Sequence, residues 1–183
     1  MPYHAIQTEL AGVIILEPKI FKDERGFFYE SFNQRDFAKA TGLNVSFVQD
    51  NHSQSKRGVL RGLHYQINHP QGKLVRVTRG EVFDVSVNLQ RNHPEFGKWV
   101  GVYLSEQNHR QLWIPPGFAH GFLVMSDEAD FLYKTTDYYS QQDERCLVWN
   151  DADVRIDWPT HDTPILTTKD ALGSRLSDAE LYE

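Results

Sequence analysis

The sequence contains a single cysteine, Cys146, in 183 residues. One cysteine excludes a disulfide bond within the chain. The sequence also lacks any run of about 18 apolar residues, the length that spans a membrane, and its first residues lack the charged-then-apolar pattern of a signal peptide. We therefore expect a soluble cytoplasmic protein that does not associate with membranes.

Positive charge is scarce. The 19 Lys and Arg residues are outnumbered by 25 Asp and Glu residues, which gives a formal net charge of −6. Binding to nucleic acid generally needs a basic face for the phosphates, so this composition argues against nucleic acid as a partner. A small anion could still bind through a few well-placed cations.

The apolar residues indicate a mainly β protein with one core. Hydrophobic residues make up 40% and aromatic residues 13% of the chain, and the aromatic residues occur within Val/Ile/Leu runs, which favours strands. Roughly ten short strands separated by Gly, Pro, Asn and Ser are typical of a β-sandwich or jelly roll. The expected strands are residues 12–17, 26–32, 45–50, 59–67, 73–78, 81–89, 99–104, 111–114, 121–125, 130–136 and 146–149.

Few helices are expected. Residues 33–41 carry Phe37 among polar residues and are followed by Gly42, a plausible helix C-cap. From about residue 150 the pattern loosens into a tail that wraps around the protein, with a short helix candidate at residues 177–181. No linker is evident, so we expect one domain over residues 1–183.

The segment from Gly58 to Gln66 places Arg61 and His64 among apolar residues of a predicted strand. Alternation puts His64 and Gln66 on one strand face, so both would point into one cavity. Histidine side chains ordinarily have a pKa of about 6.5, which suits a general base. The alternative is a packed or surface histidine with no chemical role.

A second histidine, His120, follows a turn made by Pro115 and Gly117. Two histidines on neighbouring strands suggest a metal site, but a stable site usually needs three or four ligands. Near His64 the sequence offers Gln66 and Lys73 instead of a second histidine and a carboxylate, and a fixed cation disfavours a divalent ion. The pattern therefore predicts no metal, although a simple hydrogen-bonded turn histidine stays possible for His120.

These motifs resemble the cupin family of jelly rolls, in which a histidine-bearing strand is followed by a Pro-x-Gly-x-x-His turn. Here the first motif lacks its paired His and its Glu. More closely, residues 12–170 resemble the dTDP-4-dehydrorhamnose 3,5-epimerases. The motifs that carry this resemblance are DERGFF (23–28), FVQDNHS (47–53), RGLH (61–64), QGK (71–73), GEVFDV (80–85), the Pro115 turn and FLYK (131–134).

The resemblance implies a cupin-like double-stranded β-helix and epimerisation of dTDP-4-dehydro-6-deoxy-D-glucose at C3 and C5, without metal or redox cofactor. His64 would be the base and Asp170 its hydrogen-bond partner. Lys73 would stabilise the enolate, and Tyr133 would return the proton. Taken alone, Asp170 could be a helix cap, Lys73 an exposed lysine and Tyr133 a core residue.

The resemblance also implies a set of substrate contacts and a homodimer in which Phe21 and Arg25 enter the partner's pocket. Tyr139 would stack on thymine, although Tyr138 beside it is a second candidate. The remaining residues that match substrate-contact positions are Glu30, Gln49, Asp50, Asn51, Arg61, Lys73, His120, Glu144 and Lys169.

Three alternatives stay open. A related epimerase could act on C3 or C5 alone, a metal-dependent cupin could use His64 and His120, and a non-catalytic sandwich could bind sugars without chemistry. The match of Tyr133 to a proton donor favours the double epimerase.

Overall fold

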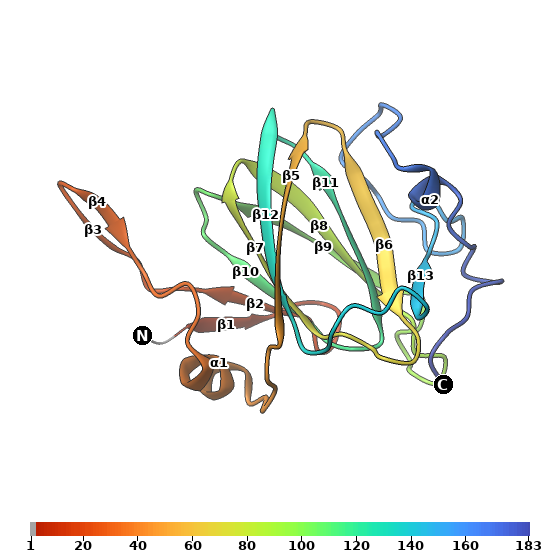
Figure 1. The fold of residues 1–183 in the computed structure, drawn as a ribbon, viewed down its shortest axis with the longest axis horizontal. Helices are drawn as coiled ribbons and strands as arrows, with labels where there is room; N and C mark the ends of the chain where they lie inside the picture. The colour runs from red at the N-terminus through yellow and green to blue at the C-terminus, as the bar shows by residue number, and fades with distance from the viewer. Residues whose placement is uncertain (1–2) are drawn as a thin grey trace.

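Two antiparallel β-sheets packed face to face form the centre of the computed structural model, which describes residues 3–183 (Figure 1). The expected jelly roll is therefore confirmed. The six-stranded sheet has the order β1 (His4–Gln7), β2 (Ile14–Glu17), β10 (Gln111–Ile114), β7 (Lys73–Arg79), β12 (Glu128–Thr135) and β5 (Gln49–Lys56). The five-stranded sheet has the order β13 (Glu144–Cys146), β6 (Leu60–Gln66), β11 (Phe118–Val124), β8 (Glu81–Asn88) and β9 (Trp99–Ser105).

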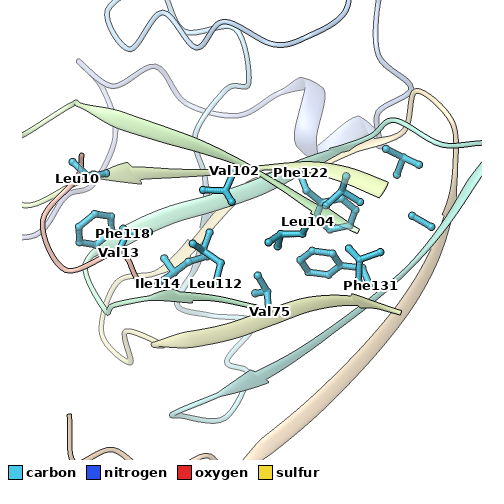
Figure 2. Packing of buried hydrophobic residues seen from close by; sticks show 14 residues of the cluster. Leu10, Val13, Val75, Val102, Leu104, Leu112, Ile114, Phe118, Phe122 and Phe131 are labelled. Atoms are coloured by element: carbon cyan, nitrogen blue, oxygen red, sulfur yellow. The ribbon is translucent and has the colours of Figure 1, made fainter. Parts of the chain in front are cut away.

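The space between the sheets is filled by apolar side chains from both. Figure 2 shows Val75 and Phe131 of the six-stranded sheet near Leu104 and Phe122 of the five-stranded sheet. The rings of Phe122 and Phe131 are stacked, with centroids 4.0 Å apart. Burial of a phenylalanine side chain contributes about 1.5–3 kcal/mol, so contacts of this kind hold the two sheets together.

Strand β8 separates this interior from a second apolar layer. Its residues Phe83, Val85 and Val87 point outward, whereas Asp84 and Ser86 lie on the opposite face, toward the other sheet. The outward face is covered by the C-terminal tail, which contributes buried apolar side chains to the same cluster. Those side chains are Val154, Trp158, Leu176 and Ala179.

Helix α1 (Gln34–Thr41) packs against the outer face of the six-stranded sheet. The Asn33 side chain caps its N-terminus, and Gly42 ends it with a left-handed conformation (φ 74°). Phe37 is fully buried against the rings of Phe47 and Trp113. The helix predicted at residues 33–41 is thus confirmed.

A two-stranded hairpin, β3 (Phe21–Asp23) and β4 (Gly26–Phe28), projects away from both sheets (Figure 1). Phe27 and Phe28 are 59% and 65% exposed, which is unusual for phenylalanine. The predicted strand at residues 26–32 therefore ends at Phe28 and pairs with a strand that the sequence pattern did not indicate.

Three other predicted strands need correction. The strand expected at residues 45–50 begins at Gln49 and runs to Lys56, because Val45 and Phe47 pack beneath α1 instead. The strand expected at 121–125 begins at Phe118, so His120 lies within β11 rather than in a turn. The strand expected at 146–149 ends at Cys146.

In the C-terminal tail the helix predicted at residues 177–181 is not formed; a turn at residues 176–178 is followed by irregular backbone. So short a segment is not stable as an isolated helix, and the residue that follows it, Tyr182, bonds through its backbone to Leu89 and Arg91. The tail does contain a short helix, α2 (Thr168–Ala171), capped by the Thr167 side chain. No helix in residues 3–183 is long and apolar enough to cross a membrane.

An irregularity in β6 determines which of its side chains face the interior. His64 pairs with His120 of β11, whereas Arg61 pairs with Phe122, so three steps along β6 match two steps along β11. This β-bulge brings Arg61 and His64 to the same side, which strict alternation would forbid. Gly62, at φ 122°, makes the bulge possible, since a Cβ there would lie 2.6 Å from Cα of Gly121 and 2.7 Å from the carbonyl oxygen of His120.

We predict that Gly62→Ala lowers the free energy of unfolding by about 1–3 kcal/mol or more, because the added methyl group forces β6 and β11 apart. Urea unfolding followed by circular dichroism measures this loss. Gly58→Ala is the matched control: Gly58 also has a positive φ (78°), but a Cβ there would meet nothing within 4 Å. Equal losses in the two variants would show that close strand approach is not what requires Gly62.

Candidate active site

A cavity of about 270 Å³ lies between the two sheets. Arg61, His64 and His120 line it from the five-stranded sheet, and Lys73 and Tyr133 line it from the six-stranded sheet. Five of the residues predicted from the sequence are thus brought together by strands that are distant in the chain.

His64 is paired with a buried carboxylate. Its Nε2 atom lies 2.6 Å from Oδ1 of Asp170, which sits in α2 and is 2% exposed. Burial alone would raise the pKa of Asp170, but the hydrogen bond and charge of His64 outweigh it and lower that pKa. An ionised carboxylate can only accept, so Nε2 carries the ring proton and Nδ1 of a neutral ring keeps its lone pair.

Lys73 is buried at the start of β7, with 7% of its surface exposed. Its Nζ donates to the backbone carbonyl of His64 at 3.2 Å. Burial lowers the pKa of Lys73 to about 8, and the nearby carboxylates of Asp84 and Glu144 limit the decrease. Lys73 is therefore a buried cation beside the histidine, not an exposed lysine at a strand end.

Tyr133 reaches the cavity from β12, on the sheet opposite His64. Burial raises the pKa of its phenol, although the charge of Arg61 acts against this. The hydroxyl group consequently keeps its proton at neutral pH and can donate it.

His120 is held by Asp84, a residue to which the sequence analysis assigned no role. The Nε2 atom of His120 lies 2.9 Å from Oδ2 and 3.1 Å from Oδ1 of Asp84, and both side chains are buried. Burial lowers the pKa of His120, against the attraction of the Asp84 carboxylate. The sequence signals for Asp84 are its place in the GEVFDV motif (80–85) and the presence of an acidic residue between Phe83 and Val85 in a strand of apolar residues.

The rim of the cavity carries charged and aromatic groups. Nζ of Lys169 lies 2.7 Å from Oε1 of Glu144, and the hydroxyl of Tyr139 donates to Oε2 of the same carboxylate at 3.0 Å. Tyr138 and Tyr139 are 65% and 53% exposed, so both present an aromatic face to solvent. Tyr139 and Glu144 line the cavity, whereas Tyr138 does not.

Other predicted contact residues lie on or near β5. The side chain of Gln49 donates to Oδ1 of Asn51 at 2.9 Å, and these two residues share a strand face with Ser53, which lines the cavity. Asp50 lies on the opposite face of β5, where both of its carboxylate oxygens are 2.9 Å from Nζ of Lys134. Asp50 is therefore not brought to the cavity.

Arg61 donates from Nε to Oγ of Ser55 at 2.9 Å, which orients its guanidinium group along the cavity wall. Three further predicted residues, Phe21, Arg25 and Glu30, do not line the cavity of their own chain. Phe21 and Arg25 belong to the projecting hairpin, where Arg25 is ion-paired with Asp23. Their contribution to a substrate site stays a prediction.

Gln66 holds the segment that carries the two rim tyrosines. Its amide nitrogen donates to the carbonyl oxygens of His69 (2.7 Å) and Tyr138 (3.2 Å), and its amide oxygen accepts from the backbone nitrogen of Ser140 (2.8 Å). The sequence placed Gln66 in the cavity with His64, which the structure confirms, but gave no hint of this role. Gln49 adds a fourth bond by accepting from the backbone nitrogen of Tyr139 (3.0 Å).

One group of potential metal ligands lies within this part of the chain. Among the described residues, His64, Cys146 and Asp170 place three ligand atoms within 4.8 Å of one another. His120 is not part of this group.

An antiparallel jelly roll whose interior holds a histidine–carboxylate pair, a protonated tyrosine and a buried lysine is a cupin-like fold equipped for acid–base chemistry. Residues 7–178 match the family model described as dTDP-4-dehydrorhamnose 3,5-epimerase. The chain belongs to this family.

Individual relatives agree with the family assignment. The dTDP-4-dehydrorhamnose 3,5-epimerase of Pseudomonas aeruginosa is 59% identical over 97% of this chain and 98% of its own length. A crystal structure of the Legionella pneumophila dTDP-6-deoxy-D-glucose-3,5-epimerase in complex with dTDP-4-keto-L-rhamnose superposes with a TM-score of 0.96 at 50% identity, covering 98% of this chain and 97% of that chain. A 3'-monoepimerase of Streptomyces bikiniensis, in complex with dTDP-quinovose, has a TM-score of 0.87 at 30% identity, covering 93% of this chain and 86% of that chain.

We predict that Gln66→Leu loosens the segment around Tyr138–Ser140. Each lost hydrogen bond contributes about 0.5–1.5 kcal/mol, so the Ser140 amide should exchange its hydrogen roughly tenfold faster or more. Hydrogen–deuterium exchange with mass spectrometry measures this. Gln54→Leu, on exposed β5, is the control, and unchanged protection in Gln66→Leu would mean that other contacts hold the segment.

Proposed function

We propose that this protein epimerises C3 and C5 of dTDP-4-dehydro-6-deoxy-D-glucose, which yields dTDP-4-dehydro-β-L-rhamnose for dTDP-L-rhamnose synthesis. The observation that carries the proposal is that a histidine base and a tyrosine acid enter one cavity from opposite sheets. Inversion at a carbon requires a proton to leave from one face and return to the other. Because His64 and Tyr133 come from opposite sheets, they would lie on opposite faces of a sugar bound between them.

His64 removes the proton. Both C3 and C5 are adjacent to the C4 ketone, so their hydrogens are acidic enough for a general base. The Asp170 hydrogen bond keeps the proton of a neutral His64 ring on Nε2, which leaves Nδ1 to accept the substrate proton. After the transfer, the carboxylate stabilises the imidazolium ion.

Lys73 stabilises the enolate. Removal of the proton moves negative charge onto the C4 oxygen. The attraction between that oxygen and the buried ammonium group is stronger in a site with little water than it would be in solution. Loss of a comparable oxyanion donor costs about 2.7–4 kcal/mol of transition-state stabilisation in other enzymes. Tyr133, still protonated, then returns a proton from the opposite sheet.

The sugar and the nucleotide occupy different parts of the site in this proposal. The cavity of about 270 Å³ is slightly smaller than the roughly 300–1,000 Å³ of most small-molecule sites, so it suits the sugar ring alone. Arg61 and Lys169 offer positive charge to the diphosphate, and exposed Tyr139 offers a ring for thymine. Gln66 keeps that ring in place through its bonds to Tyr138 and Ser140.

We also propose that the protein acts as a single-domain homodimer in which the β3–β4 hairpin completes the site of the partner subunit. The exposed rings of Phe27 and Phe28 support this, because apolar patches on projecting elements usually mark interaction surfaces. Phe21 and Arg25 would be carried into the partner's site by the same hairpin. A cytoplasmic location stays a prediction from the sequence.

A 3'-monoepimerase with the same fold makes single-centre epimerisation the second candidate. The two are separated by incubation with dTDP-4-dehydro-6-deoxy-D-glucose in deuterated water, followed by NMR. We expect deuterium at both C3 and C5. Deuterium at one centre alone would establish a monoepimerase.

The same assay tests the roles of His64 and Tyr133. His64→Asn should lower exchange by about 10²–10⁴-fold while dTDP still binds, because the base is lost but the rim is intact. Tyr133→Phe should reduce epimerisation more than exchange at the carbon, because proton removal does not need the phenol. His52→Asn, on the outward face of β5, is the matched control; exchange that survives in His64→Asn would reveal another base.

The pH dependence tests Lys73. Its pKa of about 8 means that the side chain is charged below that pH and neutral above it. We therefore expect kcat/KM, which reports the free enzyme, to fall as pH rises through about 8. Lys73→Arg keeps its charge and should remove this fall at reduced overall activity, whereas exposed Lys98→Arg should not alter it; a fall that persists in Lys73→Arg would assign it to another group.

A further inference from the structure

Cys146 has no part in the mechanism above, yet it lies beside the catalytic pair. In the pairing of β13 with β6, Cys146 is directly opposite His64. Its Sγ atom lies 4.0 Å from Oδ1 of Asp170, the same oxygen that is 2.6 Å from Nε2 of His64. We propose that His64, Cys146 and Asp170 form an inhibitory binding site for a thiophilic divalent cation such as Zn²⁺.

The three residues provide the ligand types and spacing that zinc requires. Zn²⁺ binds Cys sulfur at about 2.3 Å, His nitrogen at about 2.0–2.1 Å and carboxylate oxygen at about 2.0–2.2 Å, which places tetrahedral ligands roughly 3.3–3.6 Å apart. Here all three atoms already lie within 4.8 Å of one another. The site forms when Asp170 and His64 separate slightly and the sulfur moves inward, and water completes the coordination as the fourth ligand.

Lys169 acts electrostatically on Asp170 and Cys146, but the two lysines near this triangle have other partners. Nζ of Lys169 is engaged with Glu144, and Nζ of Lys73 is directed to the backbone oxygen of His64. Hard cations such as Mg²⁺ rarely displace a thiol proton, and the site therefore selects for soft or borderline metals.

Metal binding would remove the base from His64. The ion takes the lone pair of Nε2, the ring proton moves to Nδ1 through solvent, and the thiol proton is released to solvent. Nδ1 then has no lone pair to accept a proton from a substrate. This consequence for activity rests on the proposed function, whereas metal binding itself does not.

Binding is tested with Co²⁺ on the full chain, because thiolate-bound Co²⁺ gives an intense near-ultraviolet absorption band. We expect one equivalent of Co²⁺ to produce the band and Zn²⁺ to abolish it by displacement. Cys146→Ala should lack the band, with Cys146→Val as a second variant if the first fails to fold. His69→Ala is the control, because His69 also lies near carboxylates, those of Asp137 and Asp143, but outside the proposed site. An undiminished band in the folded Cys146 variants, or no band in the wild type, would overturn the site.

Inhibition is tested in the deuterium-exchange assay with added Zn²⁺. We expect wild-type exchange to be inhibited and restored by a chelator, and Cys146→Ala to keep its basal exchange while needing at least tenfold more Zn²⁺ for the same inhibition. Bound Zn²⁺ without inhibition, or equal sensitivity in both proteins, would overturn the inhibitory role. If the wild type shows the Co²⁺ band but no exchange at all, the proposed function fails while the metal site stands.

Discussion

The close approach of β6 and β11 is the constraint on which the site depends. Two glycines, Gly62 and Gly121, face each other where no Cβ fits, and the bulge that results lets one strand present both Arg61 and His64 to the interior. His64 then lies opposite His120 in the strand pairing. Without the bulge, one of the two side chains would point into the apolar layer beneath the C-terminal tail.

That layer explains why the tail matters for chemistry. Val154 and Trp158 cover the outward face of the five-stranded sheet, and the chain then returns along the sheet to place Asp170 within 2.6 Å of His64. The packing that stabilises the outer layer therefore also positions Asp170 beside His64.

This acidic protein places several cations at one site. Two of the cations at the site have carboxylates near them: Asp84 and Glu144 lie near Lys73, and Glu144 also binds Lys169, whereas Arg61 donates to the hydroxyl of Ser55. A buried ammonium group would be costly without such partners. The cavity can therefore attract an anion although the chain as a whole is negative.

The sequence by itself determined the jelly-roll class, the family and most strands, and its resemblance to the family singled out His64, Lys73, Tyr133 and Asp170, which the structure brings close together. It did so because alternation of apolar residues and runs of motif residues are local properties of the chain. Only the tertiary structure decided the rest, since each remaining feature depends on contacts between distant segments.

Three such features stand out. Strand β5 begins later than the sequence pattern predicts because Val45 and Phe47 pack under α1. Asp84 holds His120 because β11 places the two side by side, and Gln66 supports the segment Tyr138–Ser140. From the sequence, Cys146 only excluded a disulfide, whereas in the structure it lies beside the His64–Asp170 pair because β13 pairs with β6 at that register.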